Sequence, residues 1–109
     1  WYPYLESHPH YSLSRRQTQG GGGVIAFELK GGIHAGKILM DNIKVWQLAV
    51  SLGGVESLIQ HPASMTHAAM GPELRKEAGI SDGLVRLSVG IENVEDLIWG
   101  LEVGLNVIQ

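Results

Sequence analysis

The 109-residue chain is 44% hydrophobic and 17% charged, a composition typical of one globular domain that excludes a disordered chain. Its net charge is −3 and it has no Lys/Arg cluster, which argues against nucleic acid or an anionic membrane as a partner. The absence of cysteine excludes disulfides and thiolate metal sites.

The N-terminal residues carry no targeting signal. Segment 1–12 lacks a basic start followed by an apolar stretch, and no apolar run approaches the roughly 20 residues of a membrane span. We therefore expect a soluble cytoplasmic protein with no membrane partner. Because the sequence begins at Trp1 without a methionine, we also expect it to be a piece of a longer protein.

The first fifty residues predict two helices and a strand. Residues His8 to Gln17 can form a short helix with Ser7 as its N-cap, and the glycine run 20–23 ends it. The next segment, 24–29, has the length and residue types of a strand. Apolar residues at helical spacing then predict a helix from Ile33 to Ala49. The residues expected on its core-facing side are Leu39, Ile43, Trp46 and Val50.

Residues 50–89 predict short strands on either side of one helix. Gly53-Gly54 separates two candidate strands at 50–52 and 56–59. Gly71-Pro72 begins a helix that Gly79 ends, because proline is favoured in the first turn and glycine after the last. Alternation over 84–89 predicts a strand that carries Arg86 and Ser88 on the same face.

The C-terminal segment predicts the clearest helix, with Asn93 as its N-cap and acidic residues in its first turn. Its apolar stripe consists of Val94, Leu97, Ile98, Leu101, Leu105 and Ile108. Strands that alternate with helices across connections of mixed length favour a small α+β domain. We expect a mostly antiparallel sheet with helices covering one face.

Arg86 is the candidate binding residue, since it stands in an otherwise apolar strand. A guanidinium binds a carboxylate through two parallel charge-assisted hydrogen bonds and stays protonated. The small residues of segment 51–54 let main chain and hydroxyl approach a ligand closely. The residues alone leave two alternatives open: an edge-strand arginine in water or paired with a glutamate, and a plain tight turn at the glycines.

Three other patterns carry less weight. Gly31 to Lys37 is almost a phosphate-binding loop, but Ile38 stands where that motif needs Ser or Thr. The histidines lack an H-E-x-x-H pattern or a carboxylate cluster, so no metal site is expected. Ser64 and His67 lack a G-x-S-x-G elbow and an acid partner, so turn and capping roles explain them better than a hydrolase triad.

Several segments together resemble the pyridoxal-phosphate enzymes of cysteine and methionine metabolism over essentially the whole chain. These segments are YPYLESHP, VIAFELKGG, KILMDNIKVWQLA, SLGGVESL, HPASMTH, GISDGLVRLSVGIE and VEDLIWGLEVGL. The resemblance implies the small C-terminal domain of a fold-type I enzyme. Residues 1–20 would be the connecting helix and hinge from a missing large N-terminal domain, and residues 21–109 the substrate-binding small domain.

The resemblance also assigns roles to individual residues. In such enzymes the residue at the position of Arg86 binds the substrate α-carboxylate. The residue at Ser51 lies beside substrate and cofactor, and the residue at Thr66 is near the same pocket. The implied cofactor is pyridoxal 5'-phosphate, bound mainly by the large domain, and the implied partner is an amino-acid substrate.

No catalytic, cofactor-binding or metal-binding residue is expected in this chain. The Schiff-base lysine of the family lies in a Ser-x-Thr-Lys segment of the large domain. The lysines present here lack that context: Lys30, Lys37, Lys44 and Lys76. The resemblance therefore implies that the 109 residues alone are inactive and belong to a longer enzyme.

The substrate expectation depends on the residue before the serine. Family enzymes that handle cystathionine typically carry Glu there, where this chain has Val50, and this favours a methionine γ-lyase-like C–S lyase acting by γ-elimination. Gly54 and Glu56 resemble the cystathionine group instead, so cystathionine γ-synthase or γ-lyase stays as an alternative. Family members are usually homotetramers. An alternative of another class is a stand-alone domain that acts as a binding or assembly module without catalysis.

Overall fold

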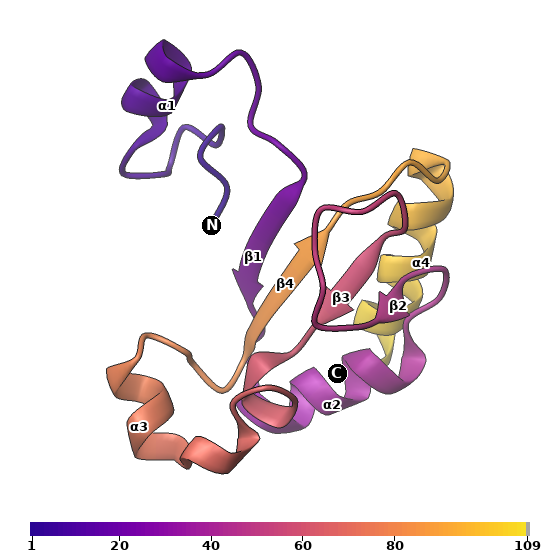
Figure 1. Cartoon of the computed structure of the whole chain (residues 1–109). Coiled ribbons are helices and arrows are strands. Elements are labelled where there is room, and N and C mark those ends of the chain that lie inside the picture. The colour runs from indigo at the N-terminus through magenta and orange to yellow at the C-terminus, as the bar shows by residue number, and fades with distance from the viewer. Residues whose placement is uncertain (109) are drawn as a thin grey trace.

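The computed structural model describes residues 1–108 as a four-stranded sheet with its two longest helices packed on one face (Figure 1). In chain order the elements are α1 (Tyr11–Gln17), β1 (Val24–Glu28), α2 (Gly32–Asn42), β2 (Gln47–Leu48), β3 (Leu58–Gln60), η1 (Pro62–Ser64), η2 (Ala68–Met70), α3 (Pro72–Glu77), β4 (Leu84–Ser88) and α4 (Val94–Val107). The strand order is β1-β4-β3-β2. β4 is antiparallel to β1 and to β3, whereas β2 and β3 are parallel, so the predicted α+β class is confirmed with a mixed sheet.

The sheet has an apolar and a polar face, because successive strand residues point to opposite sides. Leu87 of β4 lies opposite Ile25 of β1 and Ile59 of β3, and these side chains join the core with α2 and α4. Arg86 lies opposite Gln60 in the same β3–β4 ladder, on the other face. The candidate site residue thus lies on the side of the sheet that these two helices leave uncovered.

The core joins the sheet to α2 and α4. Its buried residues are Leu39, Trp46, Ile59, Val85, Leu87 and Leu97. The indole N–H of Trp46 donates to the Leu97 carbonyl of α4 at 2.9 Å, which satisfies a polar group that would otherwise be costly to bury. Gly100 lets α4 lie directly against the chain after α2, since a Cβ at this position would collide with the Lys44 carbonyl oxygen. Within residues 1–108, no helix is both long and apolar enough to cross a bilayer.

The predicted helix from Ile33 to Ala49 is wrong in its second half. α2 ends at Asn42, and Ile43 is extended with φ −66° and ψ 146°. Val45 has a φ of 71°, which redirects the chain so that Trp46 still reaches the core. The apolar residues keep their spacing beyond the end of the helix, because Trp46, in irregular backbone, faces the same core as Leu39 of α2. Val50, expected on the buried side, is 55% exposed.

Three other predictions also differ from the structure. The strand expected at 50–52 is absent, and β2 is formed by Gln47–Leu48 before the loop begins. The strand expected at 56–59 begins later, as β3 at Leu58–Gln60. Ser7 does not cap the first helix, because α1 starts at Tyr11 with His10 at its N-cap and no capping side-chain bond.

The C-terminal helix agrees with the prediction at its start. The Asn93 side chain accepts hydrogen bonds from the main-chain N–H groups of Glu95 at 2.9 Å and Asp96 at 3.3 Å, which satisfies two donors of the first turn. Of the predicted apolar stripe, Leu97 is buried. Ile98 is 53% exposed, so the stripe is only partly covered within residues 1–108.

Candidate functional site

Arg86 lies on β4, an inner strand, and its half-buried side chain binds main-chain carbonyls. Its Nη2 donates to the Val50 oxygen at 2.8 Å and to the Ser51 oxygen at 3.2 Å. Its Nε is buried and has no hydrogen-bond partner among the described residues. The edge-strand position that the sequence left open is therefore not found. Pairing with a glutamate is not found either, since the one ion pair in residues 1–108 joins Arg75 to Asp82.

Ser88 of β4 also contacts the loop between β2 and β3 and keeps this loop close to Arg86. Gly53 donates its main-chain N–H to the Ser88 Oγ at 2.9 Å. Gly53 has a φ of 81°, a conformation that side-chain-bearing residues rarely adopt, so the turn requires glycine. Arg86 and Ser88 thus contact the same loop from one face of one strand, as the alternation in the sequence predicted.

The far end of the loop is fixed by Ser57 and Glu92. Ser57 donates from its main-chain nitrogen to Oε2 of Glu92 at 2.9 Å and from its hydroxyl to Oε1 at 2.8 Å. The Ser57 main-chain bond, with the hydroxyl bond after it, lowers the pKa of the Glu92 carboxyl below its ordinary value of 4.5. Gly90 donates its N–H to the Ser57 hydroxyl at 2.8 Å, so both ends of the loop are bound to β4 and the residues after it.

Thr66 is linked to the Arg86 strand through Gln60. The Gln60 amide, only 5% exposed, donates to the Thr66 hydroxyl at 2.8 Å, and this hydroxyl also lies 2.8 Å from Nδ1 of His67. Gln60 was not singled out in the sequence, because the predicted strand ends at residue 59, whereas β3 includes Gln60. The structure brings Thr66 to the neighbour of Arg86 and not to Arg86 itself.

Ser51 meets Arg86 through its main-chain carbonyl, while the residue itself is exposed. Thr66 is exposed as well, so the predicted site residues line an open surface. A cavity of about 350 Å³ lies elsewhere, between α3 and the start of β4, and its lining includes Pro72, Ile80 and Ser81. The geometry offers a half-buried guanidinium that is held by two carbonyls and has no carboxylate partner within residues 1–108. A guanidinium in this state can attract an anion.

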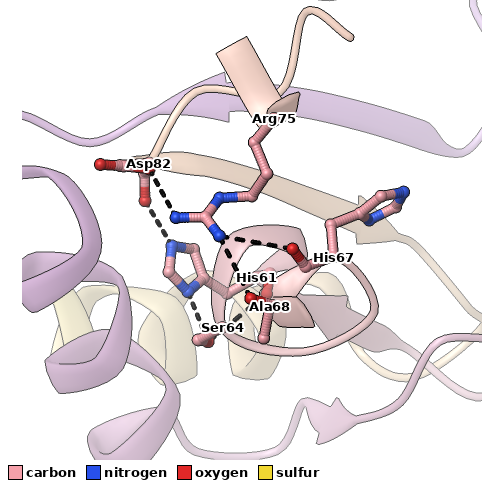
Figure 2. A network of polar contacts seen from close by, with 6 residues as sticks. All are labelled: His61, Ser64, His67, Ala68, Arg75 and Asp82. Atoms are coloured by element: carbon pink, nitrogen blue, oxygen red, sulfur yellow. Dashed lines mark hydrogen bonds and ion pairs between the residues drawn. The ribbon is translucent and has the colours of Figure 1, made fainter. Parts of the chain in front are cut away.

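A second polar cluster, missed in the sequence, surrounds His61 (Figure 2). His61 is fully buried, and its Nε2 lies 2.6 Å from the Asp82 carbonyl while its Nδ1 lies 2.7 Å from the Ser64 hydroxyl. A carbonyl can only accept, so Nε2 is the donor in the contact with Asp82, and Nδ1 shares the second hydrogen bond with the Ser64 hydroxyl. The ring packs against Gly36 of α2, where a Cβ would collide with it.

Arg75 completes this cluster from α3. It is 4% exposed, and its Nη2 forms a 3.2 Å ion pair with Oδ1 of Asp82. Its Nη1 points to the carbonyls of His67 and Ala68, both at 3.4 Å (Figure 2). From the sequence, Arg75 is placed near the C-terminal end of the helix predicted between Gly71 and Gly79, where a positive charge is favourable, and no cluster is indicated. Its position seven residues before Asp82, across Gly79, was the available signal.

The described residues include no buried lysine and no metal cluster. Residues 1–108 contain no group of three or more histidine and carboxylate side chains that could hold a metal ion. All four lysines are exposed: Lys30, Lys37, Lys44 and Lys76. The Arg86 guanidinium is half-buried and has no acidic partner among the described residues.

The chain belongs to the Cys/Met metabolism PLP-dependent enzyme family, whose sequence model matches residues 1–106. It is 59% identical over 108 residues to the L-methionine gamma-lyase of Fusobacterium nucleatum subsp. nucleatum, covering 99% of this chain and 27% of that protein. It is 55% identical over 104 residues to the L-methionine gamma-lyase of Pseudomonas putida, covering 95% of this chain and 26% of that protein.

The fold agrees with solved structures of the same family. Cystathionine gamma synthase from Xanthomonas oryzae pv. oryzae, in complex with aminoacrylate and cysteine, superposes with a TM-score of 0.86 at 55% identity, covering 97% of this chain and 27% of that chain. Cystathionine gamma-lyase from Lactobacillus plantarum, complexed with L-serine, gives 0.87 at 42% identity, covering 100% of this chain and 28% of that chain. The chain therefore spans about a quarter of the length of these relatives. Its family uses pyridoxal phosphate.

Proposed function

We propose that this chain is the C-terminal substrate-binding part of a pyridoxal-phosphate-dependent sulfur amino acid enzyme, a methionine γ-lyase-like C–S lyase. The observation that carries the proposal is the half-buried guanidinium of Arg86, which is held by the Val50 and Ser51 carbonyls and has no carboxylate partner within residues 1–108. A substrate carboxylate supplies the negative charge that the described residues do not give this arginine. Because the guanidinium is fixed before the ligand arrives, little of its freedom remains to be lost on binding.

Ser51 and Thr66 belong to the proposed binding surface as neighbours of this anchor. The Ser51 carbonyl braces Nη2, which leaves the exposed serine hydroxyl free to approach the substrate or the cofactor. Gln60 and His67 contact the Thr66 hydroxyl, so the Thr66 side chain is oriented on the same side of the sheet as Arg86. Their proposed roles are therefore contact and orientation around a bound amino acid.

The proposed chemistry divides between this chain and a larger domain. When bound, pyridoxal phosphate acts as an electron sink that allows the α and β protons to leave and the γ-substituent to be expelled. Arg86 holds the acid end of the substrate, which fixes the α-carbon relative to the groups that move its protons. All four lysines of the chain are exposed, and this supports a cofactor-bearing lysine in the part of the enzyme outside this sequence.

The domain boundary is part of the proposal. We assign residues 1–20 to the connecting helix and hinge and residues 21–109 to the small domain. α1 lies apart from the sheet, and the glycine run separates it from β1, which supports this division (Figure 1). We further propose a cytoplasmic homotetramer for the whole enzyme.

The side chains near Arg86 favour an uncharged substrate. Val50 and Leu52 are 55% and 52% exposed on the loop that contacts the guanidinium, so an apolar surface adjoins the anchor. A thioether side chain matches such a surface better than the distal ammonium of cystathionine does. The second candidate is a cystathionine γ-synthase or γ-lyase. It is favoured by the 55% identity to the Xanthomonas oryzae synthase over 97% of this chain.

Arg86→Ala in the full-length holoenzyme tests the anchor. The charged contact with the substrate carboxylate is lost, so the KM for L-methionine should rise about 100-fold. The absorbance of the bound cofactor should stay unchanged, because the proposed cofactor site lies elsewhere. Arg16→Ala is the control, since Arg16 is exposed on α1. Unchanged kinetics in the Arg86 variant would show that this residue does not bind the substrate.

A second measurement separates the candidate functions. Turnover of L-methionine is compared with turnover of L-cystathionine by the same enzyme, and a preference for cystathionine would overturn the choice of methionine. A parent reading frame without an upstream cofactor-binding lysine segment would instead support a binding or assembly module without catalysis.

A further inference from the structure

We propose that Ser88 is a positioning residue for the carboxylate anchor. It fixes the loop whose carbonyls hold Arg86, and it does so through one hydrogen bond to Gly53. This inference rests on the proposed function, because it concerns how the same arginine is prepared for an amino-acid carboxylate. Ser88 contacts the loop and not the ligand, so it influences ligand binding through the position of Arg86.

Ser88 is suited to this task by its burial. It is 2% exposed, and its Oγ accepts the Gly53 N–H at 2.9 Å. A buried hydroxyl without a partner costs free energy, so this position favours a loop conformation that brings a donor to it. Ser88 also lies two residues beyond Arg86 on the same strand face, which fixes the spacing between the two contacts.

Gly53 is suited to be the partner by its backbone. Its φ is 81°, and a Cβ added to it would meet no heavy atom within 4 Å. Glycine is therefore present for the conformation of the turn and not for lack of space. That turn presents the Gly53 N–H to Ser88 while the carbonyls of Val50 and Ser51 face the guanidinium.

The link to Arg86 follows from how few contacts hold this part of the loop. Between Val50 and Gly54, the side-chain hydrogen bonds within residues 1–108 come from Arg86 and Ser88 alone. The flanking contacts are main-chain bonds: Ala49 donates to the Ile59 carbonyl at 3.2 Å, and Ile91 donates to the Val55 carbonyl at 2.9 Å. Without the Ser88 hydroxyl, Arg86 makes the remaining side-chain hydrogen bonds to the loop between these two contacts. The guanidinium then gains freedom that a carboxylate must remove on binding.

The test uses Ser88→Ala in the full-length holoenzyme with two readouts. Hydrogen–deuterium exchange of the peptide covering residues 50–55 reports on the loop itself. Titration of the cofactor absorbance with glycine, which has the carboxylate and amino groups but no γ-substituent, reports on the anchor. We expect faster exchange of the loop peptide and glycine binding weaker by about threefold to tenfold, the range for one neutral hydrogen bond.

Ser81→Ala is the matched control. The Ser81 hydroxyl is also buried but has no hydrogen-bond partner within the described residues, so its removal should change neither readout. Ser88→Cys keeps a weak acceptor of similar size and should fall between Ser88 and Ala in both measurements. It also decides the question if the alanine variant does not fold.

The outcomes separate the two proposals. Faster loop exchange together with weaker glycine binding, absent in the Ser81 variant, supports the role of Ser88. Unchanged exchange overturns it, and so does faster exchange with unchanged glycine affinity. Arg86→Ala, measured alongside, decides the proposed function independently: if that variant binds glycine normally, the carboxylate anchor itself is wrong, whatever Ser88 does to the loop.

Discussion

Two arginines of this domain are held by main-chain carbonyls, and they differ in what completes the contact. Arg75 is 4% exposed and pairs with the Asp82 carboxylate at 3.2 Å, beside the carbonyls of His67 and Ala68. Arg86 contacts two carbonyls of the β2–β3 loop but no carboxylate within residues 1–108.

The difference shows why one arginine is structural and the other is a candidate for binding. Asp82 neutralises the Arg75 charge inside the fold, so an external acid would have to compete with an internal one. Arg86 keeps a charge that no carboxylate of the described residues compensates, on a face of the sheet that α2 and α4 do not cover. If this contrast is correct, changes at the two arginines should affect different measurements.

Arg75→Ala should produce the largest loss of stability. It removes the donor to Asp82 and to two carbonyls, and we expect a loss of about 3 kcal/mol, at the low end for a broken buried pair because the Asp82 side chain is 47% exposed. Urea unfolding of the full-length polypeptide measures it. The exposed Arg16 gives the control, since its alanine variant should stay within about 0.5 kcal/mol of the parent. A loss below about 1 kcal/mol in Arg75→Ala would contradict a structural role.

Gly36→Ala should disturb the same cluster by crowding. A Cβ on this residue of α2 collides with the His61 ring, which is bonded through both nitrogens and cannot move freely. We expect a loss of about 2 kcal/mol, typical of overpacking. Gly20→Ala serves as control, because a Cβ there meets nothing within 4 Å. Equal unfolding midpoints for the two variants would refute tight packing of His61 on α2.

Arg86→Lys should change substrate binding and leave stability nearly unchanged. Lysine keeps the charge but loses the planar fork, so we expect the KM for L-methionine to rise about tenfold. Thermal unfolding should shift little, because the loop carbonyls that lose their partner are accessible to water. A lysine variant that loses stability and keeps its KM would show that Arg86, like Arg75, has a structural role.

Glu92→Gln should give the smallest effect, and one that depends on pH. Hydrogen bonds from Ser57 hold the pKa of Glu92 below 4.5, so the folded state favours the ionised form. This contribution is fully present above that value and is lost as the pH falls through the lowered pKa. The difference in Tm between parent and variant should therefore exist at about pH 7 and shrink in acid. A difference that grows in acid would have the wrong sign.

Much of the fold followed from local signals. The N-cap at Asn93, the proline at the start of α3 and the alternation of β4 each depend on neighbouring residues, and each prediction was correct. The helix past Asn42 failed because Trp46 reaches the core from irregular backbone, held by a bond to the Leu97 carbonyl 51 residues away. No local pattern contains that contact.

The candidate site, too, was predicted where the signals are local and missed where they are not. Arg86 and Ser88 share a strand, so alternation placed them together, and their contacts with the loop at 50–53 agree with the adjacency expected from the sequence. The cluster of His61 and Arg75 was missed because its members come from separate turns that meet at Asp82 only in the folded chain. The substrate roles of Arg86, Ser51 and Thr66 stay predictions until the variants are measured.

The oxygens that hold the Arg86 guanidinium belong to the main chain. The atoms that brace the guanidinium exist whichever amino acids occupy positions 50 and 51. If Arg86 binds a substrate carboxylate as proposed, divergence at these two positions alters the shape and polarity offered to the rest of the substrate and leaves the carboxylate contact in place. A lineage built on such a domain can acquire new preferences through single replacements.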